Sequence, residues 1–249
     1  MSIFRALLRR ELSSFFFSLT GYVIIAAVTL LTGLSFVVLL QNLGTDPSPM
    51  PVTEMFYRTY FFWLIVLLVT PVITMRLFAL EKATGTFETL MTTAAGDAQV
   101  VAAKFTAAMI FYLCAWLPLL SCLMIVQHFT QQNALDAGTM GGMFLGIFLT
   151  GGLFLSLGCF ASSLTQSQMA AAMISLVLGV SLFALGFLAE AVPVAAQWQS
   201  QILSRFGLFQ QMHDFARGVV DTRTVIFYAS MTFLFLFLTL RAVESRRWK

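Results

Sequence analysis

Six long runs of apolar residues constrain this chain more than any other feature of its sequence. They cover roughly residues 19–40, 60–75, 105–126, 140–164, 169–189 and 225–240. A helix of about 20 residues crosses the hydrocarbon core of a bilayer. The runs do not alternate polar and apolar residues, as the strands of a closed barrel would. We therefore predict an all-α polytopic membrane protein with six transmembrane helices.

The composition agrees with lipid as the main solvent of the chain. Of its 249 residues, 59% are hydrophobic and 10% are charged, whereas soluble domains carry about 25% charged residues. The first apolar run is too long for the core of a signal peptide and lacks a small-residue cleavage site, so we expect it to remain as a span. Residues 1–249 are expected to form a single transmembrane domain.

The basic residues predict the orientation of the spans. With a cytoplasmic N-terminus, ten of the fourteen Lys and Arg residues fall in cytoplasmic segments, which is the positive-inside pattern. These ten are Arg5, Arg9, Arg10, Arg76, Lys82, Lys104, Arg241, Arg246, Arg247 and Lys249. The even number of spans then returns the C-terminus to the cytoplasm. Residues 76–104 become the main cytoplasmic segment, 190–223 the largest outer segment, and 42–58 an outer loop whose residues 46–51 form a turn-forming, non-helical stretch.

Residues 2–18 form a basic amphipathic stretch ahead of the first span. Ile3, Leu7 and Leu8 share one helical face, and Arg5 and Arg9 lie largely off it. Such a helix is expected to lie in the membrane interface, with its Arg side chains at anionic headgroups. An N-terminus that only sets the topology has the same charges and remains an alternative.

The spans and loops offer little chemistry of their own. The apolar cores contain almost no ionisable side chain, which disfavours an ion-coupled carrier. The chain has no GxxxxGK[ST] phosphate-binding loop, no HExxH and no GxSxG motif. Cys114, Cys122 and Cys159 lie inside apolar runs and form no CxxC pair. We therefore predict a protein that is not an enzyme and binds no metal, cofactor or nucleic acid itself.

The fourth apolar run is rich in small residues. Gly142 and Gly146 are spaced as GxxxG, which makes a flat face for close approach of another helix. This face is expected either to pack inside the bundle or to form the seam of a dimer.

The polar stretch 81–93, EKATGTFETLMTT, interrupts the apolar sequence between the second and third runs. Gly85 is a plausible N-cap, Glu88 can fold back onto free N–H groups, and Phe87 shares an apolar face with the residues three and four positions further on. Asp97 is expected to cap the helix that becomes the third span. The polar face is expected to have no partner within the chain. A docking helix and an ordinary linker on the membrane surface both fit this pattern.

The residues around this stretch resemble the signature of ABC-2 type transporter membrane subunits, in particular the gliding-motility-associated permeases. The resemblance rests on Pro71-Val-Ile-Thr-Met-Arg76, Ala79, Glu81, Gly85-Thr86, Glu88-Thr-Leu90 and Lys104-Phe105. It continues in Asp214-Phe-Ala-Arg-Gly-Val-Val-Asp-Thr-Arg223, Phe227-Tyr228 and Arg241-Ala-Val-Glu-Ser-Arg-Arg-Trp248. The chain departs from the pattern at Leu80, where many relatives have an acidic residue, and at Ala94, where a proline is common.

The resemblance implies the transmembrane subunit of an ATP-driven exporter in a bacterial cytoplasmic (inner) membrane. Two such subunits, identical or different, would pair, and two copies of an ATP-binding subunit would hold ATP and Mg²⁺. The loop between spans two and three would be the coupling helix that enters a cleft of the ATPase. The matching positions for that contact are Arg76, Glu81, Gly85, Thr86 and Glu88.

The outer segment 190–223 is expected to contain short helices, as the resemblance also implies. Trp198, Phe206 and Phe209 follow near-helical spacing there, and they would form an outer gate, a docking site for an outer-domain partner, or a packed lid. Asp221 is placed to cap the sixth span.

Two other functions remain open. The chain could be a mechanical or scaffolding subunit of an envelope or gliding-type complex, in which ATP hydrolysis drives assembly or movement. A stand-alone channel or carrier fits less well, because the cores carry no charge and the stretch 81–93 has the pattern of a docking helix.

Overall fold

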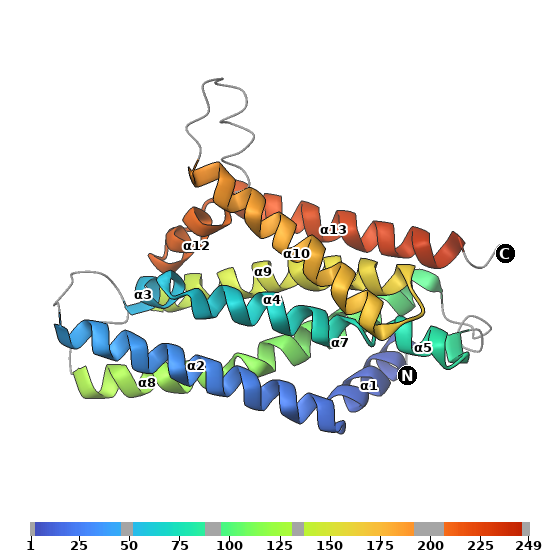
Figure 1. Cartoon of the computed structure of the whole chain (residues 1–249), viewed down its shortest axis with the longest axis horizontal. Coiled ribbons are helices and arrows are strands. Elements are labelled where there is room, and N and C mark those ends of the chain that lie inside the picture. Colours follow the sequence, from blue (N-terminus) through green and yellow to red (C-terminus); the bar gives the residue numbers. More distant parts are fainter. Residues whose placement is uncertain (1–2, 46–51, 88–95, 131–136, 192–206, 246–249) are drawn as a thin grey trace, which may run out of the picture.

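The computed structural model describes residues 3–45, 52–87, 96–130, 137–191 and 207–245, and these residues form a bundle of helices (Figure 1). Six helical segments are long and apolar enough to cross a membrane, which confirms the predicted all-α polytopic fold. The start of α1 (Ile3–Phe16) and the end of α13 (Thr222–Ser245) lie at the same end of the bundle, as an even number of spans requires.

The described helices follow the predicted spans closely, with short helices between them. They are α1 (Ile3–Phe16), α2 (Leu19–Thr45), α3 (Val52–Arg58), α4 (Tyr60–Thr74), α5 (Ala79–Ala83), α7 (Asp97–Ala115), α8 (Leu117–Thr130), α9 (Ala137–Leu164), α10 (Gln168–Ala191), α12 (Leu208–Ala216) and α13 (Thr222–Ser245). We call the end of the bundle with α1, α5 and the start of α7 the α5 end. The opposite end, with α3 and α12, is the α12 end (Figure 1).

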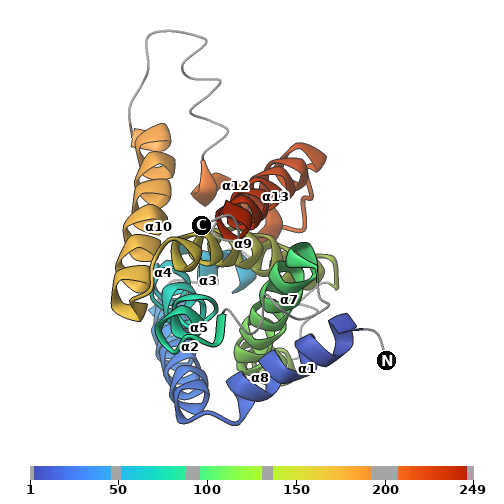
Figure 2. The same ribbon diagram turned by 90° about the vertical axis from the view of Figure 1, so that its right-hand side faces the viewer.

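Helix α9 lies at the centre of the bundle and contacts α4, α7, α10, α12 and α13 (Figure 2). In its apolar stretch 78% of the residues are buried, compared with 11% in α13 and 28% in α10. Small residues allow this central position. A side chain at Gly151 would meet the ring of Tyr112 on α7, and one at Gly158 would meet Thr74 on α4.

The Gly142–Gly146 face is occupied within the chain. An added Cβ at Gly142 would lie 2.3 Å from the carbonyl oxygen of Phe215, and one at Gly146 would lie 3.2 Å from the sulfur of Met212. Both of these partners belong to α12. The flat face therefore holds the short helix α12 against the central helix of the same chain.

Two predicted boundaries change because of hydrogen bonding. Helix α7 begins at Asp97 with Gly96 as its N-cap, so the prediction of Asp97 as the cap is wrong by one residue. The third span is two helices, α7 and α8, which meet at Trp116. Pro118 has no N–H to donate to Cys114 four residues earlier, and Trp116 donates to Leu113 at 3.1 Å instead.

The predicted loop 42–58 is partly helical, because α2 continues to Thr45 and α3 covers Val52–Arg58. Residues 46–51, which were predicted to be non-helical, lie outside the described part. Tertiary contacts stabilise α3, because Phe56 is buried and the Tyr57 hydroxyl donates to the carbonyl of Met143 at 2.7 Å. Asp221 caps α13 as predicted, through Oδ1 and the N–H of Arg223 at 2.9 Å.

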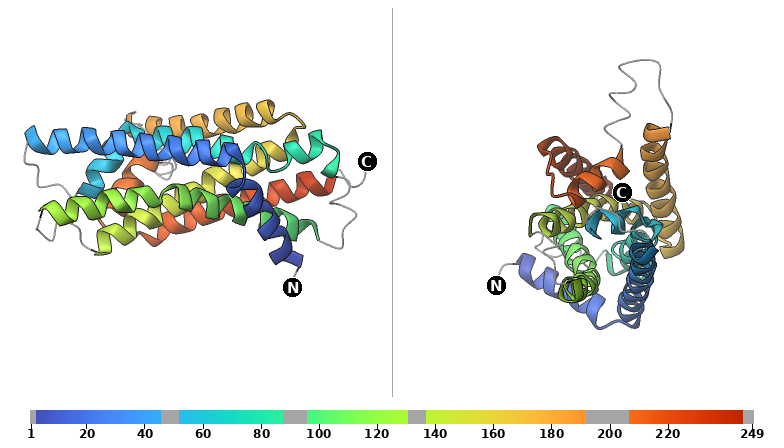
Figure 3. Two further views of the ribbon diagram at one scale, coloured as in Figure 1. Left: turned by 90° about the horizontal axis from the view of Figure 1, so that it is seen from below. Right: turned by 90° about the vertical axis from the view of Figure 1, so that its left-hand side faces the viewer.

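Helix α1 crosses the bundle obliquely and packs mainly on α7 (Figure 3). Its predicted helical state is confirmed, and Phe15 stacks on Phe111 with ring centroids 5.0 Å apart. Phe17 and Leu19, at the junction with α2, are 85% and 82% exposed.

The two neighbouring glycines of α9 provide a test of this packing. Gly142→Ala is expected to lower the free energy of unfolding by about 1–3 kcal/mol, because its Cβ would meet the α12 backbone. Gly141→Ala has nothing within 4 Å and should leave stability unchanged or raise it by up to about 1 kcal/mol through helix propensity. Thermal denaturation in detergent measures both, and equal stabilities would contradict this account of the contact.

Candidate functional site

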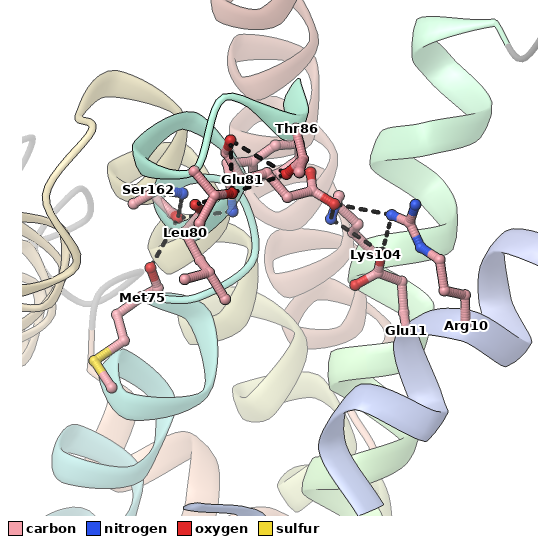
Figure 4. Close-up of polar contacts among 11 residues, drawn as sticks. Arg10, Glu11, Met75, Leu80, Glu81, Thr86, Lys104 and Ser162 are labelled. Atoms are coloured by element: carbon pink, nitrogen blue, oxygen red, sulfur yellow. Dashed lines mark hydrogen bonds and ion pairs between the residues drawn. The ribbon is translucent and has the colours of Figure 1, made fainter. Parts of the chain in front are cut away.

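Four charged side chains from three helices form a closed ring of alternating charge at the α5 end (Figure 4). Lys104 Nζ lies 3.1 Å from Glu11 Oε1 and 2.9 Å from Glu81 Oε1. Arg10 Nη2 lies 2.7 Å from the same Glu11 atom and 2.8 Å from the same Glu81 atom. The ring therefore connects α1, α5 and α7 through two cations and two carboxylates.

Lys104 depends most on its ion pairs, because it is the most deeply buried of the four side chains in the ring. Its side chain is 2% exposed, and an ammonium group removed from water costs several kcal/mol unless it is paired. Both carboxylates meet that requirement, and the ring of Phe78 lies 5.5 Å from Nζ as a cation–π partner. Lys104 therefore requires α1 and α5 to lie beside the first turns of α7.

Arg10 forms the solvent side of the ring, with its side chain 52% exposed. Partial burial lowers its pKa, but the hydrogen bonds and charges of Glu11 and Glu81 outweigh that effect and leave the pKa above its ordinary value. Arg10 is therefore a permanent cation, and it shares both carboxylates with Lys104.

A second set of contacts holds α5 on the central helix. Ser162, near the end of α9, accepts hydrogen bonds from the N–H groups of Phe78 and Ala79, both at 3.1 Å. Its own hydroxyl donates to the carbonyl of Met75 at 3.4 Å. Lys82 also donates to the carbonyl of Ser163. The start of α5 is thus pinned to α9, and Glu81 ties the same short helix to α1 and α7.

Beyond α5 the chain turns outward. Ala83, Thr84, Gly85 and Thr86 are exposed, and we call these four residues the α5 tip. Gly85 has a φ of 73°, a left-handed conformation that glycine adopts without strain. It was predicted as an N-cap; it follows Thr84, the C-cap of α5, and lies directly before the helical residues 86 and 87. Glu88 and the rest of the predicted helix lie outside the described residues.

One expectation about this segment is wrong. The polar face of stretch 81–93 was expected to have no partner within the chain, yet Glu81 pairs with both Arg10 and Lys104. The reason is that the helix α1, far away in sequence, crosses the bundle and brings Arg10 to α5. Only Glu81 Oε1 takes part; Oε2 is buried and accepts no hydrogen bond within the described part of the chain.

Arg76, the remaining predicted contact residue, lies just after α4 and donates to the hydroxyl of Thr20 at the start of α2. Arg76, Glu81 and Thr86 all line one pocket of about 570 Å³ at the α5 end. The structure therefore brings together three of the predicted site residues, with Gly85 beside them in the tip.

The α12 end contains a second charged cluster. Glu54 on α3 is 1% exposed, and Arg217 donates to both of its carboxylate oxygens, at 3.0 and 2.8 Å. The hydrogen bond and charge of Glu54 raise the pKa of Arg217 above its ordinary value. His213 Nδ1 lies 3.6 Å from the same carboxylate. This cluster fixes α12 on α3.

The predicted outer aromatic residues are described only in part. Phe209 on α12 contacts Trp63 of α4 and Phe183 of α10, with ring centroids 4.9 and 5.0 Å apart. Trp198 and Phe206 lie outside the described residues. Phe209 is thus part of an aromatic contact between three helices.

Sequence reasoning missed Glu11 and Glu54 as pairing residues. The available signal was a single acidic residue in each of two otherwise apolar or basic helices, together with one lysine, Lys104, directly before the third apolar run. An isolated charge in such surroundings calls for a partner, but its position in the sequence does not identify that partner.

No metal site appears in the described part of the chain, where no three His, Cys, Asp or Glu side chains gather suitably. No protein-family model matches the chain, and no curated protein matches it. The geometry of the α5 end therefore has to carry the functional argument.

Removing the central cation tests the charged ring. Lys104→Met leaves two carboxylates facing each other without their buried partner, and it is expected to cost about 3–5 kcal/mol of stability. The exposed Arg241–Glu244 pair at the same end is a control, because Arg241→Gln should cost no more than about 1 kcal/mol.

Adding Glu81→Gln to Lys104→Met should recover part of the loss, because it removes one of the two opposed charges. Thermal and chemical denaturation in detergent measure these differences. A Lys104→Met protein as stable as Arg241→Gln would contradict the structural importance of the ring.

Proposed function

We propose that this multi-pass membrane protein is the transmembrane subunit of an ATP-driven ABC-2 type exporter. The observation that carries the proposal is the α5 tip, an exposed turn between spans two and three that is anchored to the bundle directly behind it. A separate subunit with a P-loop would supply ATP hydrolysis, with ATP and Mg²⁺ bound there. The resemblance of the residues around the tip to this family supports the same assignment.

The contacts of α5 suit a segment that passes force into the spans. Ser162 connects it to the central helix α9, and Glu81 connects it to α1 and α7. A push on the tip would therefore reach three helices through hydrogen bonds and ion pairs, without a flexible linker between them. Rigid-body tilting of packed helices is a common way of moving between two states.

This geometry divides the predicted contact residues into two roles. Gly85 and Thr86 lie in the exposed tip and, with Glu88, would touch the ATPase. Glu81 lies behind them in the charged ring, so its role would be to position α5. Arg76 would hold the adjoining end of α4 through Thr20.

The outer surface of the bundle is compatible with pairing of two membrane subunits. The apolar stretches of α10 and α13 are 28% and 11% buried, so most of each surface faces lipid or another chain. In the proposed complex two copies of this chain, or this chain and a related one, would enclose the path of the cargo. The basic α5 end would face the cytoplasm of a bacterial cell, with both termini on that side.

Co-purification tests the proposal. The chain, isolated from its native membrane in mild detergent, is expected to bring down a protein with a P-loop whose ATP hydrolysis depends on the complex. Glu88→Arg should weaken that association by roughly 30-fold or more, as expected for reversal of a charged contact worth about 2 kcal/mol. Glu244→Arg makes the same charge change at the same end, away from the tip, and should retain the partner.

A fully bound and active ATPase in the Glu88→Arg complex would contradict the proposed contact. A complex that hydrolyses ATP in vesicles, without moving any cargo across them, would instead favour the mechanical or scaffolding function.

A further inference from the structure

The pocket at the α5 end is lined in part by polar and apolar side chains that take no part in the charged ring. It has a volume of about 570 Å³ and lies among α1, the end of α4, α5 and the start of α7. Arg10, Arg76, Ser14 and Thr86 provide its polar wall, and Phe15 and Leu80 belong to its apolar wall. One side of the pocket can therefore bind a polar group while the other contacts hydrocarbon.

The cations of the pocket outnumber its carboxylates. Glu11 and Glu81 are each shared between Arg10 and Lys104, so two positive and two negative charges cancel in the ring. Arg76 adds a third cation, and it donates a hydrogen bond to the neutral hydroxyl of Thr20. Within the described residues no carboxylate lies within ion-pair distance of Arg76. Among the described residues that line it, the pocket thus has three cations and two carboxylates, an excess of one positive charge.

An anion would bind on the side of Arg76 and Arg10. Lys104 is buried and saturated by the two carboxylates, while Arg10 is half exposed and Arg76 partly exposed. The guanidinium fork matches the oxygen atoms of a phosphate group, and the hydroxyl group of Ser14 offers a further donor along the same wall. The buried Glu81 Oε2 would repel an anion from the deep side of the pocket.

The surroundings distinguish a lipid from a free phosphate ion. Phe17 and Leu19 follow α1 directly and are 85% and 82% exposed, so together they form an exposed apolar surface near Phe15 of the pocket wall. The pocket is lined by Phe15, close to this apolar junction, and by Thr86 of the exposed α5 tip, so it lies between an apolar and a polar surface. Basic pockets between transmembrane helices on the cytoplasmic side bind anionic headgroups.

We propose that this pocket binds an anionic phospholipid, with the headgroup phosphate held by Arg76 and Arg10 and an acyl chain against Phe15 and Leu80. Bound there, one lipid would touch α1, α4, α5 and α7 at once. It would stabilise the arrangement in which α5 is presented. The proposal concerns this chain alone and does not depend on an ATPase partner.

The test uses the purified chain in a neutral detergent, with melting temperature as the readout. Short-chain phosphatidylglycerol is expected to raise the melting temperature at concentrations where phosphatidylcholine does not. Arg76→Gln should weaken the apparent affinity for phosphatidylglycerol about fivefold, the value of one basic residue at a membrane surface. Arg76→Lys keeps the charge and should retain most of the affinity.

Two further variants separate binding from folding and from overall charge. Arg241→Gln removes one cation from the same end, outside the pocket, and should bind phosphatidylglycerol like the parent chain. Ser14→Leu changes an exposed side chain that lines the pocket, so it should fold normally and reduce the response by obstruction. It keeps the test decisive even if Arg76→Gln is unstable.

Three results would overturn the proposal. The first is an equal response to phosphatidylcholine and phosphatidylglycerol. The second is an equal loss of affinity in Arg241→Gln and Arg76→Gln. The third is a full response to inorganic phosphate alone, which would show a site for the free ion.

Discussion

The buried ammonium group of Lys104 is the interaction on which the α5 end depends. Burying such a group in an apolar helix bundle is costly unless carboxylates are buried beside it and pair with it. Those carboxylates come from two elements that are distant in sequence, Glu11 on α1 and Glu81 on α5. One charge in α7 thus requires two short helices at the bundle end, and Arg10 closes the arrangement by balancing the second negative charge.

Helix α9 has the corresponding role in the apolar interior. Its glycines remove the side chains that would otherwise separate it from α4, α7 and α12. Its last turn carries Ser162, which accepts two N–H groups at the start of α5. The same helix therefore packs the spans and holds the exposed turn between two of them. Because of this double contact, a force on α5 would be transmitted to the centre of the bundle.

Several features of the fold could be predicted from the sequence for simple physical reasons. Apolar runs of spanning length predict the number of membrane helices, because hydrocarbon leaves the backbone few alternatives. Asp221 caps α13 as predicted, since capping is a local interaction. Local reasoning was less reliable where tertiary contacts decide the outcome: α3 is helical because Tyr57 and Thr53 bond to α9 and α12, which the sequence around them does not reveal.

The sequence by itself determined that lipid surrounds most of this protein, that its fold is helical and that a polar turn separates spans two and three. These properties follow from composition and from the spacing of residues that are close in sequence. The tertiary structure decided where the charges of that turn go. Glu81 was expected to await a partner from outside, and the crossing of α1 supplies Arg10 from 71 residues away. Among the described residues, Arg76 contacts Thr20 and adds a third cation to the pocket that the charged ring lines. Ion pairs between distant segments depend on how helices pack, and no local pattern specifies that packing.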